Sequence, residues 1–340
     1  MRNIMVTGGA GFIGSAFVRY AVATYPEYNI ITFDKLTYAG NLDNLLPVKN
    51  APNFRFEQGD IADREAVRAV LETYQIDTIV NFAAESHVDR SILDPEAFLR
   101  TNVFGVYTLL EQGRDFGIGR FLQVSTDEVY GDVEEGHSIE TDNFLPNSPY
   151  ASAKAGGELM VRSYHVTYGM DTVITRGSNT YGIYHYPEKI IPLFITEALE
   201  DKPLPVYGDG MQIRDWLYVD DHARGVDLVL HKGISGEAYN IAGEDLRHNI
   251  DVTKYLLKLL NKPESLIKYV PDRPGHDRRY AMSADKARAL GWERQYTFET
   301  GLAHTVEWYL ANEGWWRKIK TGEYLEFYKR QYEARLAEAN

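Results

Sequence analysis

The 340-residue sequence contains no cysteine. Disulfide bonds, thiolate catalysis and thiolate zinc sites are therefore excluded. No apolar run approaches the roughly 18 residues that span a bilayer. Near the N-terminus, Ile4, Met5 and Val6 lead directly into a glycine turn, which is not the pattern of a secretory signal. These absences predict a cytoplasmic protein with no membrane partner.

Positive charge is also scarce. The chain has 36 lysines and arginines against 49 aspartates and glutamates, so its net charge is −13. Binding of nucleic acid depends on a basic footprint, and no nucleic-acid partner is expected. An acidic chain still holds an anionic ligand where a few cations converge.

Short apolar runs in the first half alternate with amphipathic stretches. Residues 63–74 are an example of the latter, because Val67, Val70, Leu71 and Tyr74 recur at helical spacing. The expected strands are residues 3–7, 30–34, 54–58, 78–83, 120–125 and 172–176. Such alternation predicts an α/β fold with a Rossmann-type, doubly wound parallel sheet.

After residue 178 the pattern changes to proline-punctuated, tyrosine-rich loops. The expected division is a Rossmann domain over 1–178, with 213–243 returning to it. Residues 179–212 and 244–340 are expected to form a smaller C-terminal α/β substrate-binding lobe. The charged tail after Trp316 is expected to be a solvated helix on the surface.

Gly8, Gly11 and Gly14 lie between the first expected strand and the first expected helix. Glycines at such a turn let the backbone approach a pyrophosphate at the positive end of the helix. Asp34 ends the second strand, where a carboxylate accepts the ribose hydroxyls of an adenosine and repels a 2′-phosphate. NAD is therefore favoured, although the neighbouring Lys35 keeps NADP open.

Further along the chain, other residues are candidates for the same cofactor. Asp60 follows the third strand, where its carboxylate could accept from the adenine amino group or simply belong to a loop. Phe82, Ala83 and Ala84 follow the fourth strand. Small residues there suit close passage of a cofactor, and tight packing alone would explain them equally well.

Tyr150 and Lys154 are four residues apart and share one face of an expected helix. A nearby ammonium stabilises a phenolate, so the pKa of Tyr150 is expected to be lowered towards working pH. Asp127 and Glu128 follow the fifth strand. A hydride transfer alone does not need this acid–base pair, which indicates that a proton is removed and a hydroxyl expelled as well. The alternative is a capped turn with two solvated carboxylates.

Seven stretches together resemble the extended short-chain dehydrogenase/reductase family over essentially the whole chain. They are GGAGFIG at 8–14, AAESHVDRS at 83–91, STDEVYG at 125–131, NSPYASAK at 147–154, PEKIIP at 187–192, YGDG at 207–210 and DRPGH at 272–276. Within this family the motifs most resemble the nucleotide-sugar 4,6-dehydratases. The Thr-Asp-Glu order at 126–128 is typical of the branch that acts on dTDP-glucose.

The resemblance implies an NAD-dependent lyase that oxidises the sugar at C4, eliminates water across C5 and C6, and returns the hydride to C6. Tyr150 would take the proton of the C4 hydroxyl, Glu128 the proton of C5, and Asp127 would protonate the leaving C6 hydroxyl. Ser125 and Thr126 would hydrogen-bond the C4 oxygen. Relatives usually pair through two long helices per subunit, so a homodimer is expected.

The resemblance also assigns the site residues, with no metal ion among the ligands. The catalytic set is Thr126, Asp127, Glu128, Tyr150 and Lys154. The cofactor set is Gly8, Gly11, Phe12, Ile13, Gly14, Asp34, Lys35, Leu36, Thr37, Asp60, Ile61, Phe82, Ala83, Ala84, Ser86, Asn102, Ser125, Tyr150, Lys154 and Thr180. The set for the nucleotide-sugar substrate is Ser86, His87, Thr126, Asp127, Glu128, Tyr150, Asn179, Lys189, Ile190, Pro205, Tyr207, Arg214, Asn240, Arg273 and His276.

Two positions depart from the family pattern Asn-Asn-Tyr-Gly-Pro. Thr180 replaces an amide expected near the nicotinamide, and Ile183 replaces a proline in the sugar-facing loop. These departures leave the cofactor contact and the exact hexose open. UDP-specific dehydratases can share Thr-Asp-Glu, so three alternatives stay open: a UDP-glucose 4,6-dehydratase, an epimerase, or a non-catalytic protein that senses a dinucleotide.

Overall fold

The computed structural model describes residues 1–338. Its central sheet has seven parallel strands in the order β10-β6-β5-β4-β1-β2-β3. The strands are β1 (Asn3–Thr7), β2 (Asn29–Asp34), β3 (Phe54–Gln58), β4 (Thr78–Asn81), β5 (Arg120–Thr126), β6 (Thr172–Gly177) and β10 (Ala238–Ile241). The Rossmann-type sheet is thus confirmed, and the bounds of β1 to β6 lie within two residues of those predicted. No separate strand was predicted at β10.

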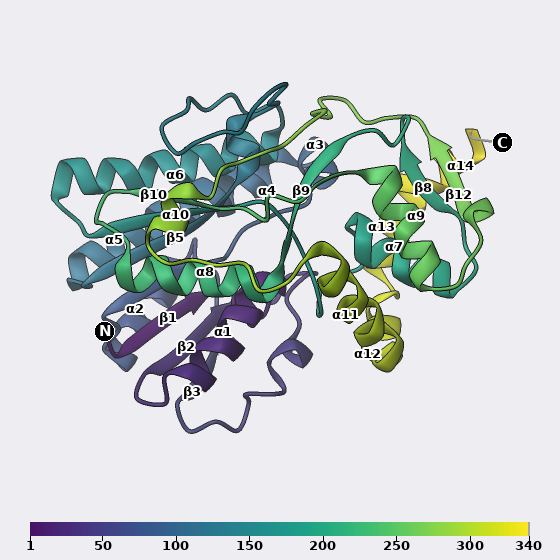
Figure 1. The fold of residues 1–340 in the computed structure, drawn as a ribbon. Helices are drawn as coiled ribbons and strands as arrows, with labels where there is room; N and C mark the ends of the chain where they lie inside the picture. Colours follow the sequence, from purple (N-terminus) through teal and green to yellow (C-terminus); the bar gives the residue numbers. More distant parts are fainter. Residues whose placement is uncertain (339–340) are drawn as a thin grey trace.

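Helices cover both faces of this sheet (Figure 1). On one face α1 (Phe12–Thr24) packs against α8 (Val219–Lys232), and on the other α5 (Val106–Phe116) packs against α2 (Arg64–Tyr74) and α6 (Pro149–Tyr168). Local sequence sets their ends. The Asp63 carboxylate caps α2, and the Ser148 hydroxyl caps α6, whose first residue is a proline.

Between β4 and α5 the chain forms α3 (Val88–Leu93), α4 (Pro95–Leu99) and a π-helical turn, η2 (Arg100–Gly105). Four other short helices join the larger elements: η1 (Leu42–Leu45), η3 (Asp127–Tyr130), η4 (Glu264–Leu266) and α10 (Asp285–Ala289).

The second lobe lies beyond the carboxyl ends of the central strands (Figure 1). It contains the parallel pair β8 (Leu204–Tyr207) and β12 (Ile267–Val270). Its helices are α7 (Ile190–Leu199), α9 (Asn249–Leu259), α11 (Phe298–Ala311), α12 (Glu313–Ile319), α13 (Glu323–Tyr328), η5 (Lys329–Glu333) and α14 (Ala334–Glu338). A sheet of β7 (Asn179–Tyr181), β9 (Ile213–Tyr218) and β11 (Leu246–His248) joins the lobes.

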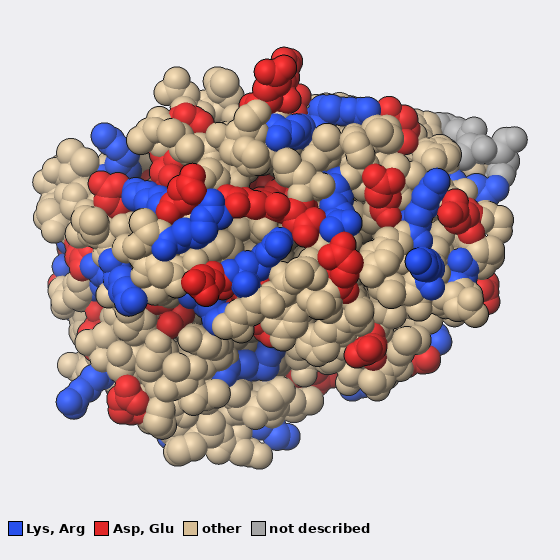
Figure 2. Space-filling model, in the orientation of Figure 1, with Lys and Arg blue, Asp and Glu red and all other residues tan. Residues whose placement is uncertain are grey.

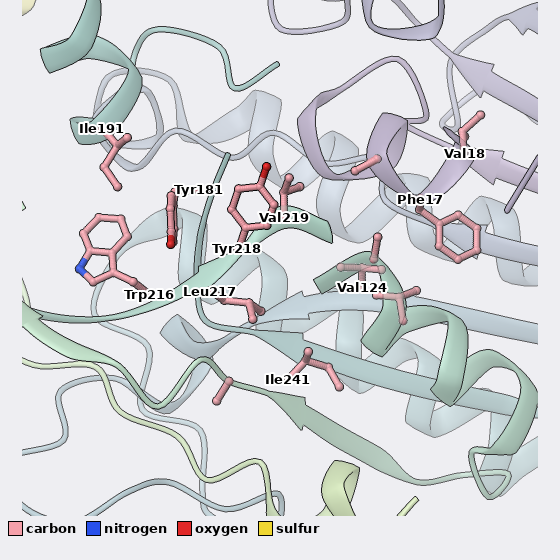
Figure 3. Close-up of a cluster of buried hydrophobic side chains, with 14 of the residues drawn as sticks. Phe17, Val18, Val124, Tyr181, Ile191, Trp216, Leu217, Tyr218, Val219 and Ile241 are labelled. Atoms are coloured by element: carbon pink, nitrogen blue, oxygen red, sulfur yellow. The ribbon is translucent and has the colours of Figure 1, made fainter. Parts of the chain in front are cut away.

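One hydrophobic core extends through both lobes. In Figure 3, Phe17 of α1 lies at one side and Trp216 and Ile191 at the other, with Tyr218 and Val219 between them. The predicted boundaries between the lobes therefore stay a prediction.

The C-terminal tail differs from the solvated helix that was predicted. Trp316 is completely buried, and Tyr324, Phe327 and Tyr332 are also buried. The prediction was wrong because it followed the charged residues of the tail. The aromatic residues gave no regular pattern, since they recur at irregular spacing across three short helices. The tail contacts Tyr207 of β8 through Gln331, and Asn44 of η1 through Trp315.

The described surface carries mixed charge. On the face shown in Figure 2, basic and acidic side chains are interspersed rather than gathered into one basic patch. None of the helices within residues 1–338 combines the length and the apolar composition that a membrane span requires.

Candidate active site

A cavity of about 410 Å³ runs along the carboxyl ends of the central strands and continues into the second lobe. Residues after β1, β2, β3, β4, β5 and β6 line it, together with residues of β8 and β9. In doubly wound sheets this edge is where ligands bind. All residues of the three predicted sets except Leu36, Asn102 and Asn240 line this one cavity.

The glycine turn is shaped for close approach by a ligand. Gly8 has a φ of +66°, and a Cβ there would lie 2.5 Å from the Ala83 nitrogen. A Cβ on Gly14 would lie 2.2 Å from the Gly8 oxygen. Gly11, at the start of α1, offers no side chain to cap the helix. The positive end of α1 is thus left to the cavity, which fits a dinucleotide pyrophosphate.

Asp34 and Lys35 occupy the expected adenosine end. The Asp34 carboxylate accepts hydrogen bonds from the nitrogens of Ala10 (2.9 Å) and Leu36 (2.8 Å), and burial raises its pKa. Lys35 forms an ion pair with Asp60 at 2.9 Å. Since Asp60 already neutralises Lys35, this end favours ribose hydroxyls over a 2′-phosphate.

Leu36 and Asn102 lie outside the cavity lining, which differs from their predicted contact with the cofactor. Leu36 has a φ of +57°, and its amide orients Asp34. The buried Asn102 side chain accepts from the Glu85 nitrogen and donates to the Glu85 oxygen, both at 2.9 Å. Asn102 therefore holds the loop after β4, which carries Ala84 in the cavity lining.

Helix α6 brings Tyr150 and Lys154 to the cavity. The Lys154 ammonium donates to the Val124 oxygen at 2.7 Å, and burial lowers its pKa to about 8. The expected lowering of the Tyr150 pKa is wrong for this structure. Burial and the negative charge of Glu128 raise it, and a hydrogen bond from Thr126 counteracts them only in part.

The 3₁₀ turn after β5 positions both carboxyl groups. Thr126 begins this turn; its hydroxyl accepts from the Glu128 nitrogen (3.3 Å) and donates to Asp127 Oδ1 (3.1 Å). Asp127 is 4% exposed, and its Oδ2 has no hydrogen-bond partner within residues 1–338. The turn is capped, as in the alternative interpretation, but its carboxyl groups line the cavity.

The two carboxyl groups differ in acidity. Burial, reinforced by the charge of Glu128, raises the pKa of Asp127 well above its ordinary value. Burial also raises the pKa of Glu128, but there the cations of Lys189, Arg273 and Arg214 oppose it. Of the two groups, Asp127 has its pKa raised more strongly, so Asp127 is suited to act as the acid and Glu128 as the base.

Three cations converge at the far end of the cavity. Lys189 donates to the Ser86 oxygen at 2.9 Å, and Arg273 pairs with Asp89 at 3.2 Å. Arg214 is buried and lies 4.2 Å from the centre of the Tyr280 ring. The buried Arg273 Nε has no hydrogen-bond partner in the described part of the chain. This end fits the diphosphate of a nucleotide.

Asn240 does not lie with the predicted substrate residues. Its fully buried side chain accepts from the Tyr130 hydroxyl at 2.8 Å and donates to the Ser138 oxygen at 3.2 Å. It lies on β10, behind the cavity lining. The prediction is corrected to a structural role, since both ends of the amide already have protein partners.

Several cavity residues were not predicted. Glu188 belongs to the stretch PEKIIP at 187–192 and precedes Lys189, so the sequence could have identified it as a cavity residue. His222 follows a strand of the joining sheet, and Tyr332 comes from the C-terminal tail. Neither residue belongs to a sequence motif that predicts a site, because each reaches the cavity only through the packing of the two lobes.

Comparison with known proteins gives consistent matches. A family model described as GDP-mannose 4,6 dehydratase matches residues 5–305. The chain is 47% identical to dTDP-glucose 4,6-dehydratase of Escherichia coli, over 95% of this chain and 97% of that one. A crystal structure of dTDP-glucose 4,6-dehydratase from Streptomyces venezuelae with NAD and TYD bound superposes with a TM-score of 0.91. It is 49% identical and covers 94% of this chain and 100% of that chain.

More distant structures include UDP-glucose 4-epimerase of Thermus thermophilus in complex with NAD. It has a TM-score of 0.85 at 29% identity, and the match covers 91% of this chain and 99% of that one. The epimerase thus shares the architecture at a lower identity than the dehydratases.

Proposed function

This chain belongs to the dTDP-glucose 4,6-dehydratase family, and on that premise we propose that its cavity converts dTDP-glucose to dTDP-4-keto-6-deoxyglucose with NAD as cofactor. The observation that carries the proposal is the buried Asp127, whose pKa is raised well above its ordinary value, beside the more acidic Glu128 in one cavity with Tyr150. An acid and a base side by side serve the elimination of water.

The cavity fits NAD. The glycine turn at the start of α1 would hold the pyrophosphate, Asp34 the adenosine ribose, and Lys154 the second ribose. When bound, NAD takes a hydride from C4 of the sugar and later returns a hydride to C6.

Tyr150 holds the proton of the C4 hydroxyl. Its raised pKa makes the neutral phenol the resting form. The Thr126 hydroxyl acts against this when its one proton turns from Asp127 Oδ1 to the Tyr150 oxygen, where it stabilises the phenolate. Tyr150 accepts the C4 proton in its phenolate form. The same hydroxyl of Thr126 is placed to orient the C4 oxygen.

Elimination then uses the two carboxyl groups. Glu128 removes the proton from C5, which the neighbouring C4 ketone has made acidic. The electron pair of that C–H bond forms the C5–C6 double bond as the C6–O bond breaks. Asp127 gives its proton to the departing hydroxyl, which leaves as water. When the hydride adds to C6, a proton returns to C5. Each positioned acid or base contributes roughly 10²–10⁴-fold to such a step.

The test is to incubate the purified protein with dTDP-, UDP- and CDP-glucose and to follow each nucleotide sugar by mass spectrometry, with the hexoses released by hydrolysis and separated by chromatography to detect a C4 epimer. We expect loss of one water, fastest with dTDP-glucose. Faster loss of water from UDP-glucose would mean that the nucleobase of the substrate is uracil rather than thymine. A C4 epimer of unchanged mass would indicate epimerisation, and no reaction with any of the three would contradict the proposal.

We also propose a homodimer formed through α6. Its Leu159 and Val166 are 54% and 65% exposed, and Phe104 of η2 is 42% exposed. An exposed apolar face of this kind is typical of a contact between proteins. Light scattering during gel filtration should give twice the mass of one chain, and Leu159→Glu should shift the mass towards the monomer. The cytoplasmic location stays a prediction.

A further inference from the structure

His222 of α8 lies against the end of β6, close to the proposed reaction centre. Gly177 ends β6 and pairs in register with Thr126 of β5. The His222 ring is so close that a Cβ on Gly177 would lie 2.3 Å from its Cε1. The ring is 1% exposed and lines the cavity together with Thr180. None of the roles proposed above uses it.

The hydrogen bonds around Thr180 fix the tautomer of His222. The Thr180 hydroxyl donates to the Ser178 carbonyl oxygen at 3.0 Å. Its 2.8 Å contact with His222 Nδ1 must therefore be one in which Nδ1–H donates to Oγ1. Burial lowers the pKa of His222 to about 4, so the ring is neutral and carries only this one N–H. Nε2 is left with a lone pair.

This Nε2 has no hydrogen-bond partner among residues 1–338. A buried acceptor without a donor is unfavourable. A Cβ on residue 177 would lie 2.6 Å from Nε2, so the glycine keeps the approach to this atom open. The arrangement is a buried acceptor prepared for an N–H donor from a ligand.

The place of His222 Nε2 in the cavity identifies the donor, and this step rests on the proposed function. Hydride exchange with a sugar held by Tyr150 and Thr126 requires the nicotinamide ring at the ends of β5 and β6, where Gly177 lies. The only N–H groups on that ring belong to its carboxamide. We propose that His222 Nε2 accepts a hydrogen bond from the NAD carboxamide, and that Thr180 orients His222 for this contact.

The test is a competition that does not depend on turnover. The purified protein is equilibrated with a mixture of NAD and 3-acetylpyridine adenine dinucleotide, in which a methyl ketone without N–H replaces the carboxamide. Free dinucleotide is removed, and the bound pair is extracted and quantified by chromatography. The wild type should prefer NAD by about tenfold, the value of one buried hydrogen bond.

Three variants make the test specific. In His222→Phe the preference should fall to about one, whereas His222→Gln, which keeps an acceptor, should retain part of it. Thr180→Val removes the group that fixes the tautomer and should reduce the preference severalfold, even if His222→Phe does not fold. A preference unchanged in Thr180→Val and in folded His222→Phe would overturn the inference.

The outcomes separate this inference from the proposed function. A wild-type preference for NAD that depends on His222, without water loss from dTDP-glucose, would contradict only the proposed function. If the variants instead raise the KM for dTDP-glucose and leave the NAD preference unchanged, a sugar hydroxyl is the donor and the inference is wrong. Retention of neither dinucleotide by the wild type would overturn both.

Discussion

Replacing Asp127 by asparagine tests the division between acid and base most directly. The substitution removes the proton that the proposed elimination gives to the C6 hydroxyl and changes little else. Asp127 is buried with its pKa raised well above the ordinary value, and Asn Oδ1 can still accept from the Thr126 hydroxyl as Asp127 Oδ1 does at 3.1 Å. We therefore expect a folded protein whose melting temperature is close to that of the wild type.

The expected kinetic effect is confined to one step. Elimination should slow by roughly 10²–10⁴-fold, because a positioned acid contributes that much. This corresponds to about 3–5 kcal/mol in activation free energy. Oxidation at C4 should change by no more than about threefold, or ~0.7 kcal/mol, since Tyr150 and Thr126 are intact. The 4-keto sugar that retains its C6 hydroxyl should accumulate.

A rapid-quench experiment measures both steps in one reaction. NADH absorbance reports oxidation at C4, and mass spectrometry of the quenched nucleotide sugar reports loss of water. Equal slowing of the two steps would refute the assignment of Asp127 as the acid for the leaving group. A large fall in melting temperature would instead mean that the carboxyl group supports the turn after β5.

Three further predictions follow from other parts of the structure. Glu128→Gln should abolish solvent deuterium incorporation at C5 while NAD stays bound, and incorporation at the wild-type rate would remove Glu128 as the base. Arg273→Ala should weaken dTDP binding by about 10-fold or more in titration calorimetry, whereas Arg278→Ala, which removes an exposed cation, should not; equal losses would contradict the diphosphate site. Burial raises the pKa of Asp215 to about 7, so the stabilisation from its neutral form is complete below about pH 4 and is lost as pH rises towards 7. Between pH 5 and 7 the unfolding free energy of Asp215→Asn should therefore gain ~2 kcal/mol relative to wild type in urea titrations, and parallel curves would contradict the shift.

The inner strands of the central sheet, such as β1, β4 and β6, were predicted well because they are buried on both faces and read as short apolar runs. Asp34, Asp127 and Tyr150 were also recognised, since each follows or faces a strand end at a fixed spacing. These patterns are local in the sequence. In a doubly wound sheet the carboxyl ends of the parallel strands lie along one edge, so the residues that follow them come together there.

Other features depended on contacts that spacing does not encode. Asn240 matched a pattern but is held by Tyr130 and Ser138, because β10 lies behind the cavity lining. His222 and Tyr332 reach the cavity only through packing of α8 and the tail. The pKa of Tyr150 was predicted in the wrong direction, since desolvation in the cavity outweighs the helical neighbour four residues away.

The place of β10 has a consequence for synthesis of the chain. β6 ends at Gly177, but the strand that covers its outer edge ends at Ile241, 64 residues later (241 − 177). At translation rates of about 5–20 residues per second, the nascent protein exposes an unpaired parallel edge for several seconds. Unpaired edges invite association with other chains. Ribosome-bound chaperones are thus expected to contact the nascent protein in this interval, before α8 and β10 complete the layer.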